Sequence, residues 1–288
     1  MLIRDLQRLC CPQCHQSLSW RGATRGAPPR TIGGGPLVCA GCAASWPARD
    51  GMPALYREEE VRGNDRLMRL FYDWIPQFHD PAVRYLLPIW QLEGTEAQMR
   101  AGYVRRMELG GLQAPVDGGP VRILDVSIGT GVSVALIHAA LPPGLPVEYW
   151  GLDLATGMLR ICKRRLHRQG FAAVRLVQGD AHALPFGDAS FDRVFHVGGI
   201  GGFNEPGRAM AEMARVARPG TPIVVVDEQL DPNRSHGWWP RIWFDLVTFY
   251  DKNPHAPREF VPADALEVVE EQVGRFYYCL TFRTPVAG

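Results

Sequence analysis

Alternating apolar and polar stretches indicate a repeating unit of strand and helix in the middle of the chain. From Val121, the sequence VRILDVSIGTGVSVALI contains an apolar run, an acid, a tight glycine turn and a second apolar run. A further apolar stretch, residues 147–152, ends at Asp153. This order predicts a strand, a glycine loop, a helix and a second strand that ends in an acid.

Apolar runs further along the chain predict the rest of a sheet. We expect strands at residues 174–177, 193–197 and 223–227, and a final antiparallel hairpin within 268–284. Residues 58–120 lack strand alternation, and their apolar residues recur with a helical period. The first of these helical runs contains Val61, Leu67, Met68, Leu70, Phe71 and Trp74.

The central unit has the layout that a nucleoside cofactor requires. Gly129 and Gly131 allow the backbone to approach a ligand closely. The helix that follows offers free N–H groups to an anion. Asp153 is placed to accept hydrogen bonds from two ribose hydroxyls. The dinucleotide fingerprint G-x-G-x-x-G is incomplete, because its third glycine position is Val134.

Three later motifs follow this unit in a recognisable order, namely Gly179-Asp180-Ala181, Ser190-Phe191-Asp192 and Arg218-Pro219-Gly220. With them, residues 120–230 resemble class I S-adenosylmethionine-dependent methyltransferases, most closely the branch that contains the ubiquinone/menaquinone C-methyltransferases. The resemblance implies an α/β fold with a Rossmann-like seven-stranded sheet and helices on both faces.

The resemblance also implies how the cofactor S-adenosylmethionine is held. Asp125 and the turn 127–131 would hold its methionine end, and Asp153 its ribose. The remaining contacts would come from Leu154 and Met158 beside the adenine, Asp180 at the adenine amino group, the Ala181 backbone, and His196 with residues 197–198 beside the sulfonium. One residue departs from the family pattern: Ser127 occupies a loop position where the family often has glycine, and serine tolerates fewer backbone conformations.

Two residues are candidates for catalysis. His196 ends the predicted fourth strand, where an imidazole could accept a proton near neutral pH. Alternatively, it hydrogen-bonds the cofactor or the backbone. Tyr72 lies in Phe71-Tyr72-Asp73-Trp74, which, with Phe78-His79-Asp80, resembles the Tyr-Asp repeats on the covering helices of quinone-type methyltransferases. Alternatively, Tyr72 is a packed aromatic residue of a helix.

A second aromatic cluster follows the fifth strand, within residues 234–250. It consists of Trp238, Trp239, Trp243, Phe244, Phe249 and Tyr250. Part of this run is expected to cover the sheet, and the adjacent tryptophans could instead form an aromatic wall of a substrate pocket.

The N-terminal region has the spacing of a metal site. Cys11-Pro12-Gln13-Cys14 and Cys39-Ala40-Gly41-Cys42 form two C-x-x-C pairs, which together can surround one zinc ion tetrahedrally. Four thiolates leave no open position, so such a zinc would be structural. Cys10 is an additional thiol beside them. The alternative is a module with four reduced cysteines and no metal.

The sequence that follows the second pair resembles small zinc-ribbon domains that accompany some methyltransferases, with Asp50-Gly51 as their turn. We therefore expect three parts: a zinc-ribbon-like domain at 1–57, a helical bridge or lid at 58–120, and a class I methyltransferase domain at 121–288. No apolar run approaches the ~20 residues of a membrane span. The N-terminus is too short and too charged for a signal peptide, so we expect a cytoplasmic protein.

Three functions are compatible with these features. The leading hypothesis is an enzyme that methylates a small, hydrophobic or aromatic molecule. The second is an RNA methyltransferase that modifies ribosomal guanine, because one such class also joins a zinc domain to this fold. The chain has 31 basic and 30 acidic residues, and this near balance argues against RNA as the partner. The third is a zinc-ribbon scaffold with a vestigial or non-methylating cofactor pocket. The sequence does not determine the acceptor atom or the oligomeric state.

Overall fold

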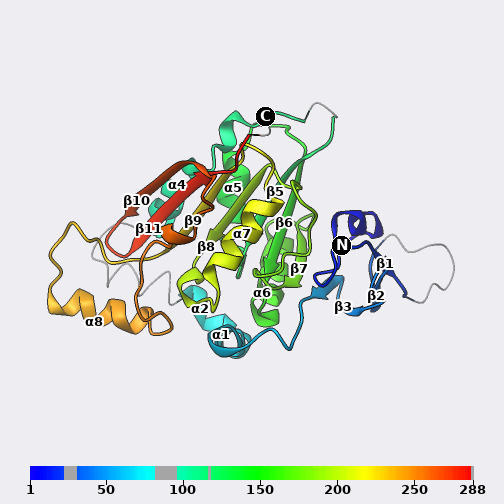
Figure 1. The fold of residues 1–288 in the computed structure, drawn as a ribbon, viewed down its shortest axis with the longest axis horizontal. Helices are drawn as coiled ribbons and strands as arrows, with labels where there is room; N and C mark the ends of the chain where they lie inside the picture. The colour runs from blue at the N-terminus through cyan, green and yellow to red at the C-terminus, as the bar shows by residue number, and fades with distance from the viewer. Residues whose placement is uncertain (23–30, 82–95, 116–117, 287–288) are drawn as a thin grey trace.

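The computed structural model describes residues 1–22, 31–81, 96–115 and 118–286 (Figure 1). Its centre is a sheet of five parallel strands: β5 (Val121–Val126), β6 (Val147–Asp153), β7 (Arg175–Gly179), β8 (Arg193–Val197) and β9 (Pro222–Glu228). An antiparallel hairpin of β10 (Leu266–Val273) and β11 (Tyr277–Arg283) joins it, in the order β7-β6-β5-β8-β9-β11-β10. The predicted Rossmann-like arrangement of seven strands is therefore confirmed.

Both faces of this sheet are covered, which explains the nearly continuous apolar runs of its parallel strands. On one face, α7 (Pro206–Val216) packs through Met210 and Met213 against Leu124 and Val225. The helices of the other face are α4 (Glu96–Arg106), α5 (Val134–Ala140) and α6 (Thr156–Arg168). Alternate residues of each strand point to opposite faces, so β5 contributes Ile123 to one layer and Leu124 to the other.

The N-terminal region forms its own antiparallel strands and then extends the central sheet. It contains a short 3₁₀ helix, Ile3–Arg8, followed by β1 (Leu18–Trp20), β2 (Gly35–Cys39), β3 (Ser45–Arg49) and β4 (Met52–Leu55). Strand β4 pairs in parallel with β7, where Leu55 lies opposite Gly179. The sheet consequently has 11 strands, with the N-terminal strands and the β10–β11 hairpin at its two ends (Figure 1).

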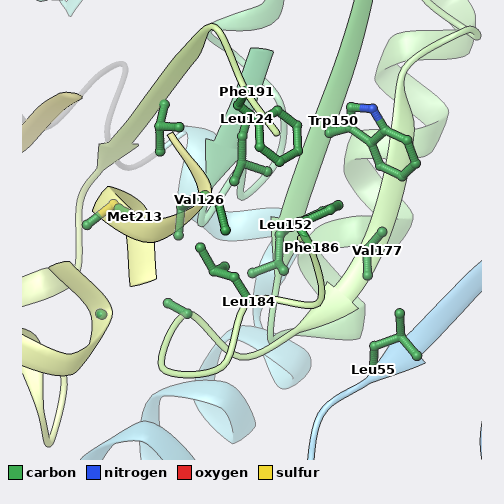
Figure 2. Packing of buried hydrophobic residues seen from close by; sticks show 14 of the residues in the cluster. Leu55, Leu124, Val126, Trp150, Leu152, Val177, Leu184, Phe186, Phe191 and Met213 are labelled. Carbon is green, nitrogen blue, oxygen red and sulfur yellow. The ribbon is translucent and has the colours of Figure 1, made fainter. Parts of the chain in front are cut away.

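Buried side chains join the N-terminal strands to the central sheet. Leu55 is fully buried in the same apolar layer as Trp150 and Val177, as Figure 2 shows. Arg175 of β7 pairs with the buried carboxylate of Asp5 at 3.0 Å. The N-terminal strands and the central sheet therefore share one continuous core.

The first helix of the bridge is amphipathic as predicted, but much of its apolar side is exposed. Helix α1 (Gly63–Trp74) leaves Leu70 and Trp74 exposed, with 52% and 83% of their surface accessible, and turns Met68 and Tyr72 towards the interior cavity described below. The short α2 (Pro76–Pro81) follows, and residues 82–95 of the expected bridge lie outside the described residues.

The second aromatic cluster covers the sheet only in part. Within α8 (Trp238–Val247), Phe244 packs edge-on against Phe276, while Trp238 is 71% exposed. Among the helices that the structure describes, none is long and apolar enough to span a membrane.

We predict that Leu55→Ala destabilises the whole fold, because it leaves a cavity where β4 joins the central sheet. The free energy of unfolding should fall by about 2–5 kcal/mol, as for other buried leucines. The matched control is Leu70→Ala at the exposed position on α1, which should change it by no more than about 0.5 kcal/mol. Guanidinium denaturation of both variants measures the difference, and equal stabilities would contradict the continuous core.

Candidate functional site

The loop between β5 and α5 folds in a conformation that ordinary residues seldom adopt. Ser127, Gly129 and Gly131 have φ angles of 61°, 56° and 75°, all in the left-handed region. At Gly131 a side chain would also lie 2.7 Å from the sulfur of Cys162 on α6, so glycine is required there for space as well. Ser127 adopts the conformation that the usual family glycine would adopt, at a cost of roughly 1–2 kcal/mol.

The carboxylate of Asp153 fixes this loop to the end of β6. One of its oxygens accepts a hydrogen bond from the Gly129 amide and the other from the Ala155 amide, both at 2.8 Å. Each carboxylate oxygen has a second lone pair. Because Asp153 also lines the cavity, it retains acceptor capacity towards a bound hydroxyl.

Asp125 lies deeper in the same cavity, at the end of β5. The hydroxyl of Tyr149 donates a hydrogen bond to it at 3.0 Å. Burial raises the pKa of Asp125 well above its usual value. Nearby, Arg100 of α4 lines the cavity and donates hydrogen bonds to Tyr103 and Ser133, each at 2.9 Å. Sequence reasoning missed Arg100, because nothing in the polar surface of α4 distinguishes it from its neighbours.

Asp180 follows β7 and lines the other end of the cavity. One of its oxygens accepts from the His182 amide at 2.9 Å and lies 2.6 Å from the His182 ring nitrogen Nδ1. Burial opposes ionisation of Asp180, but these contacts lower its pKa below the usual value. Leu154, Met158 and Ala181 line this end as well. The cofactor-binding residues predicted at β5, β6 and β7 are therefore brought together around one cavity.

Helix α1 forms part of the cavity wall, and two aspartates tie α1 and α2 to the neighbouring loops. Asp73 accepts a hydrogen bond from the Gly157 amide at the start of α6, at 2.6 Å. Asp80 accepts one from the Thr130 hydroxyl at 2.6 Å and pairs with Arg165. These contacts place Tyr72 in the cavity wall. The side chains of Phe78 and His79, which belong to the second Tyr-Asp-like repeat, lie outside the described residues.

The structure does not bring His196 to the cavity. Its side chain is fully buried, its Nδ1 lies 3.1 Å from the Val126 carbonyl oxygen, and burial lowers its pKa to about 4. The next residues of the chain, Val197 and Gly198, do line the cavity. Neighbouring strand residues point in opposite directions, so placement at a strand end did not determine which of them faces the ligand.

The wall of the same cavity also contains aromatic residues and the carboxyl group of Glu228. Tyr72, Tyr250 and Tyr277 line the cavity, together with Met99 and Val273. Glu228, the last residue of β9, accepts a hydrogen bond from the Tyr250 hydroxyl at 2.6 Å. None of Trp238, Trp239 and Trp243 is among the lining residues, so the predicted aromatic wall is formed instead by tyrosines from three separate elements.

The four cysteines of the two C-x-x-C pairs converge at one point. Their sulfur atoms lie within 4.8 Å of one another, with Cys11–Cys42 at 3.7 Å and Cys14–Cys39 at 3.4 Å. A tetrahedral zinc with bonds of about 2.3 Å requires sulfurs about 3.8 Å apart. Burial acts to raise the pKa of Cys39, but amide hydrogen bonds from Cys42 and Gly41 lower it to about 6. The convergence of the four sulfurs suits a metal ion.

Comparison with known families supports the sequence interpretation. Residues 124–225 match the family described as "Methyltransferase domain". The matched segment begins within β5 and ends within β9, so it contains the glycine loop, Asp153 and Asp180. The resemblance to class I S-adenosylmethionine-dependent methyltransferases is thereby confirmed.

Individual relatives share this central part. A demethylmenaquinone methyltransferase of Thermus thermophilus is 38% identical over 128 residues, which cover 44% of this chain and 56% of that protein. A phthiotriol/phenolphthiotriol dimycocerosates methyltransferase of Mycobacterium ulcerans is 32% identical over 171 residues, covering 54% and 60%. The chain thus spans little more than half the length of these relatives.

A solved structure supports the fold. Phosphoethanolamine N-methyltransferase 2 of Haemonchus contortus, in complex with S-adenosyl-L-methionine, superposes with a TM-score of 0.56 at 16% sequence identity. The alignment covers 81% of this chain and 62% of that structure. At this identity the likeness concerns the arrangement of strands and helices.

We predict that His196 makes stability depend on pH. The unfolded chain binds a proton at this histidine near pH 6.5, whereas the folded protein binds it only near pH 4, so stability present above pH 6.5 is lost as the pH falls towards 4. His196→Asn keeps a donor for the Val126 carbonyl but cannot bind the proton. Between pH 7.5 and 4.5 the variant should lose less stability than the wild type, by on the order of 2–3 kcal/mol. Denaturation at both pH values measures this, and identical losses would contradict the assignment.

Proposed function

We propose that the protein is an S-adenosylmethionine-dependent methyltransferase that acts on a small, hydrophobic or aromatic molecule. The observation that carries this proposal is the single cavity at the carboxyl ends of the parallel strands, where Gly129, Asp153 and Asp180 meet. Ligands of open α/β sheets bind in the crevice outside the carboxyl ends of the strands. The methyltransferase-domain match contains all three residues.

The residues of the cavity suit the parts of this cofactor in order. Asp153 would accept hydrogen bonds from the ribose hydroxyls, and Asp180, Leu154 and Met158 would surround the adenine. Ser127 and Asp125 would hold the methionine end, beside Arg100, whose positive charge complements a carboxylate. When bound, S-adenosylmethionine supplies a methyl group that a positively charged sulfur has already activated.

The rest of the cavity supports an apolar acceptor. The tyrosines at 72, 250 and 277 and the side chains of Met99 and Val273 offer aromatic and aliphatic surface. The two relatives described above carry demethylmenaquinone and phthiotriol dimycocerosates in their names, and both names describe lipid-like acceptors. These residues would orient such a molecule towards the sulfur and exclude water around it.

We also propose a structural zinc ion at Cys11, Cys14, Cys39 and Cys42. The convergence of four sulfurs within 4.8 Å of one another supports it. The zinc would stabilise the expected domain of residues 1–57, next to the bridge at 58–120 and the methyltransferase domain at 121–288. Cys10 lies outside the four, with its sulfur 3.7 Å from the His15 ring.

The cofactor assignment predicts that Asp153→Ala weakens binding of S-adenosylhomocysteine. A lost hydrogen bond to a charged group costs about 1.5–3 kcal/mol, so the dissociation constant should rise about 10- to 100-fold. The matched control is Asp188→Ala, which removes a carboxylate that is 79% exposed and outside the cavity, and should leave affinity unchanged. Calorimetry measures both. Unchanged affinity in folded Asp153→Ala protein would refute the assignment.

The zinc assignment predicts one zinc per chain in protein purified without added metal. Elemental analysis measures it, and a zinc content near zero in reduced, folded protein would disprove the site. Cys14→Ser should lose the metal and the hydrogen-exchange protection of β1 to β3, while α5 and α6 keep theirs, because the cysteines connect only the N-terminal strands. Cys10→Ser is the matched control and should retain the full zinc content.

A further inference from the structure

Glu228 places a carboxyl group in the cavity near the phenol groups of Tyr72 and Tyr250. It ends β9 at the cavity wall, where the Tyr250 hydroxyl donates to it at 2.6 Å. Its neighbour Asp227 has a structural task, because its two oxygens accept the amides of Gly199 and Gly201 at 2.9 and 2.8 Å and so hold the loop after β8. The carboxyl group of Glu228 hydrogen-bonds the backbone amide of its own residue and the side chain of Asp227, but among the described residues it holds no amide of another loop.

The groups around Glu228 are acids and phenols. Asp227 lies beside it on β9, and Tyr72 of α1 and Tyr250 after α8 lie near it. On β11 its cross-strand neighbour is Tyr277, while Tyr278 lies opposite Asp227. Among the residues that the structure describes, no arginine, lysine or histidine forms an ion pair with Glu228. The two arginines that line the cavity have other partners: Arg69 binds Glu58, and Arg100 binds Tyr103 and Ser133.

These surroundings favour a neutral carboxyl group as long as no cation is present. Burial raises the pKa of Glu228 well above its usual value, and the charge of Asp227 acts in the same direction. The hydrogen bond from Tyr250 acts against both, because it stabilises the carboxylate. A positive charge placed in the same cavity would favour the carboxylate further.

We propose that Glu228 is the proton-accepting residue of the methyl-acceptor region, and that binding of the positively charged cofactor releases its proton and so prepares it for that role. This inference rests on the proposed function. It assigns the acceptor a chemical class, a molecule with a weakly acidic hydroxyl such as a phenol or an enol. A carboxylate held by Tyr250 can accept a hydrogen bond from such a hydroxyl.

In the proposed methyl transfer, Glu228 takes the proton of the acceptor hydroxyl, and the O–H electron pair stays with the acceptor. An electron pair of the acceptor, on oxygen or on the conjugated carbon, forms the bond to the methyl carbon. The bond between sulfur and the methyl carbon breaks, and its pair remains on sulfur, which becomes neutral. With the cation gone, the surroundings again favour the protonated form of Glu228.

Proton counting during cofactor binding tests this inference without knowledge of the acceptor. Calorimetry in phosphate and in Tris, between pH 6 and 9, gives the number of protons released when each ligand binds. At the optimal pH we expect S-adenosylmethionine to release up to one proton more than S-adenosylhomocysteine, whose sulfur carries no charge. Glu228→Gln should abolish this difference and change the affinity for S-adenosylhomocysteine less than about threefold.

Two further variants separate this role from a general effect on the fold. Glu205→Gln changes a glutamate whose side chain is 64% exposed and lies outside the cavity, and should retain the full difference. Tyr250→Phe removes the hydrogen bond that favours the carboxylate, so it should move the proton release to higher pH.

The outcomes distinguish the inference from the function on which it rests. If both ligands bind and release equal numbers of protons, or if Glu228→Gln keeps the difference, the role of Glu228 is refuted while the cofactor assignment stands. If neither ligand binds the folded wild-type protein, the proposed function itself is refuted, and the role of Glu228 with it.

Discussion

The hydrogen bonds of one carboxylate, Asp153, hold together the part of the molecule on which the cavity depends. The parallel strands bring several loops to one edge of the sheet, but parallel pairing alone does not fix how those loops curve. Asp153 joins the Gly129 amide of one loop to the Ala155 amide of the next. It thereby fixes the N-terminus of α6 relative to the glycine loop. Helices α1 and α2 are then attached at the same place, through Asp73 at the start of α6 and Asp80 at Thr130. The covering helices thus depend on a surface that Asp153 arranges.

The sequence predicted the strands and the cofactor end of the cavity because both depend on local features. Short motifs predict the local backbone: a glycine turn follows an apolar strand, and an acid marks a strand end. The structure places Gly129, Asp153 and Asp180 of these motifs together in the cavity. Arg100 and Glu228 had no such signal. Each enters the cavity because its helix or strand packs beside residues that are distant in sequence, and only the three-dimensional arrangement shows it.

Two features could not be predicted from the sequence: the direction of the His196 side chain and the pairing partner of β4. The pattern around His196 gave the end of the strand but not the direction of each side chain there, and the imidazole is buried beside the Val126 carbonyl. For β4, the apolar pattern fits a small separate module, because a strand pattern does not name its partner. The structure pairs it with β7, next to Asp180 in the cavity wall.

The pairing of β4 with β7 also sets an order of events during synthesis. Strands β1 to β4 are synthesised before β7, so the hydrogen-bonding edge of β4 has no partner until Gly179 has been made. An unpaired strand edge is a site at which nascent chains associate wrongly. All four ligand cysteines have been synthesised once Cys42 is made. A metal ion bound by them would therefore order β1 to β3 before β7 is synthesised. It would leave only the short β4 without its partner, so this part of the fold would reach its final contacts only after β7 has been made.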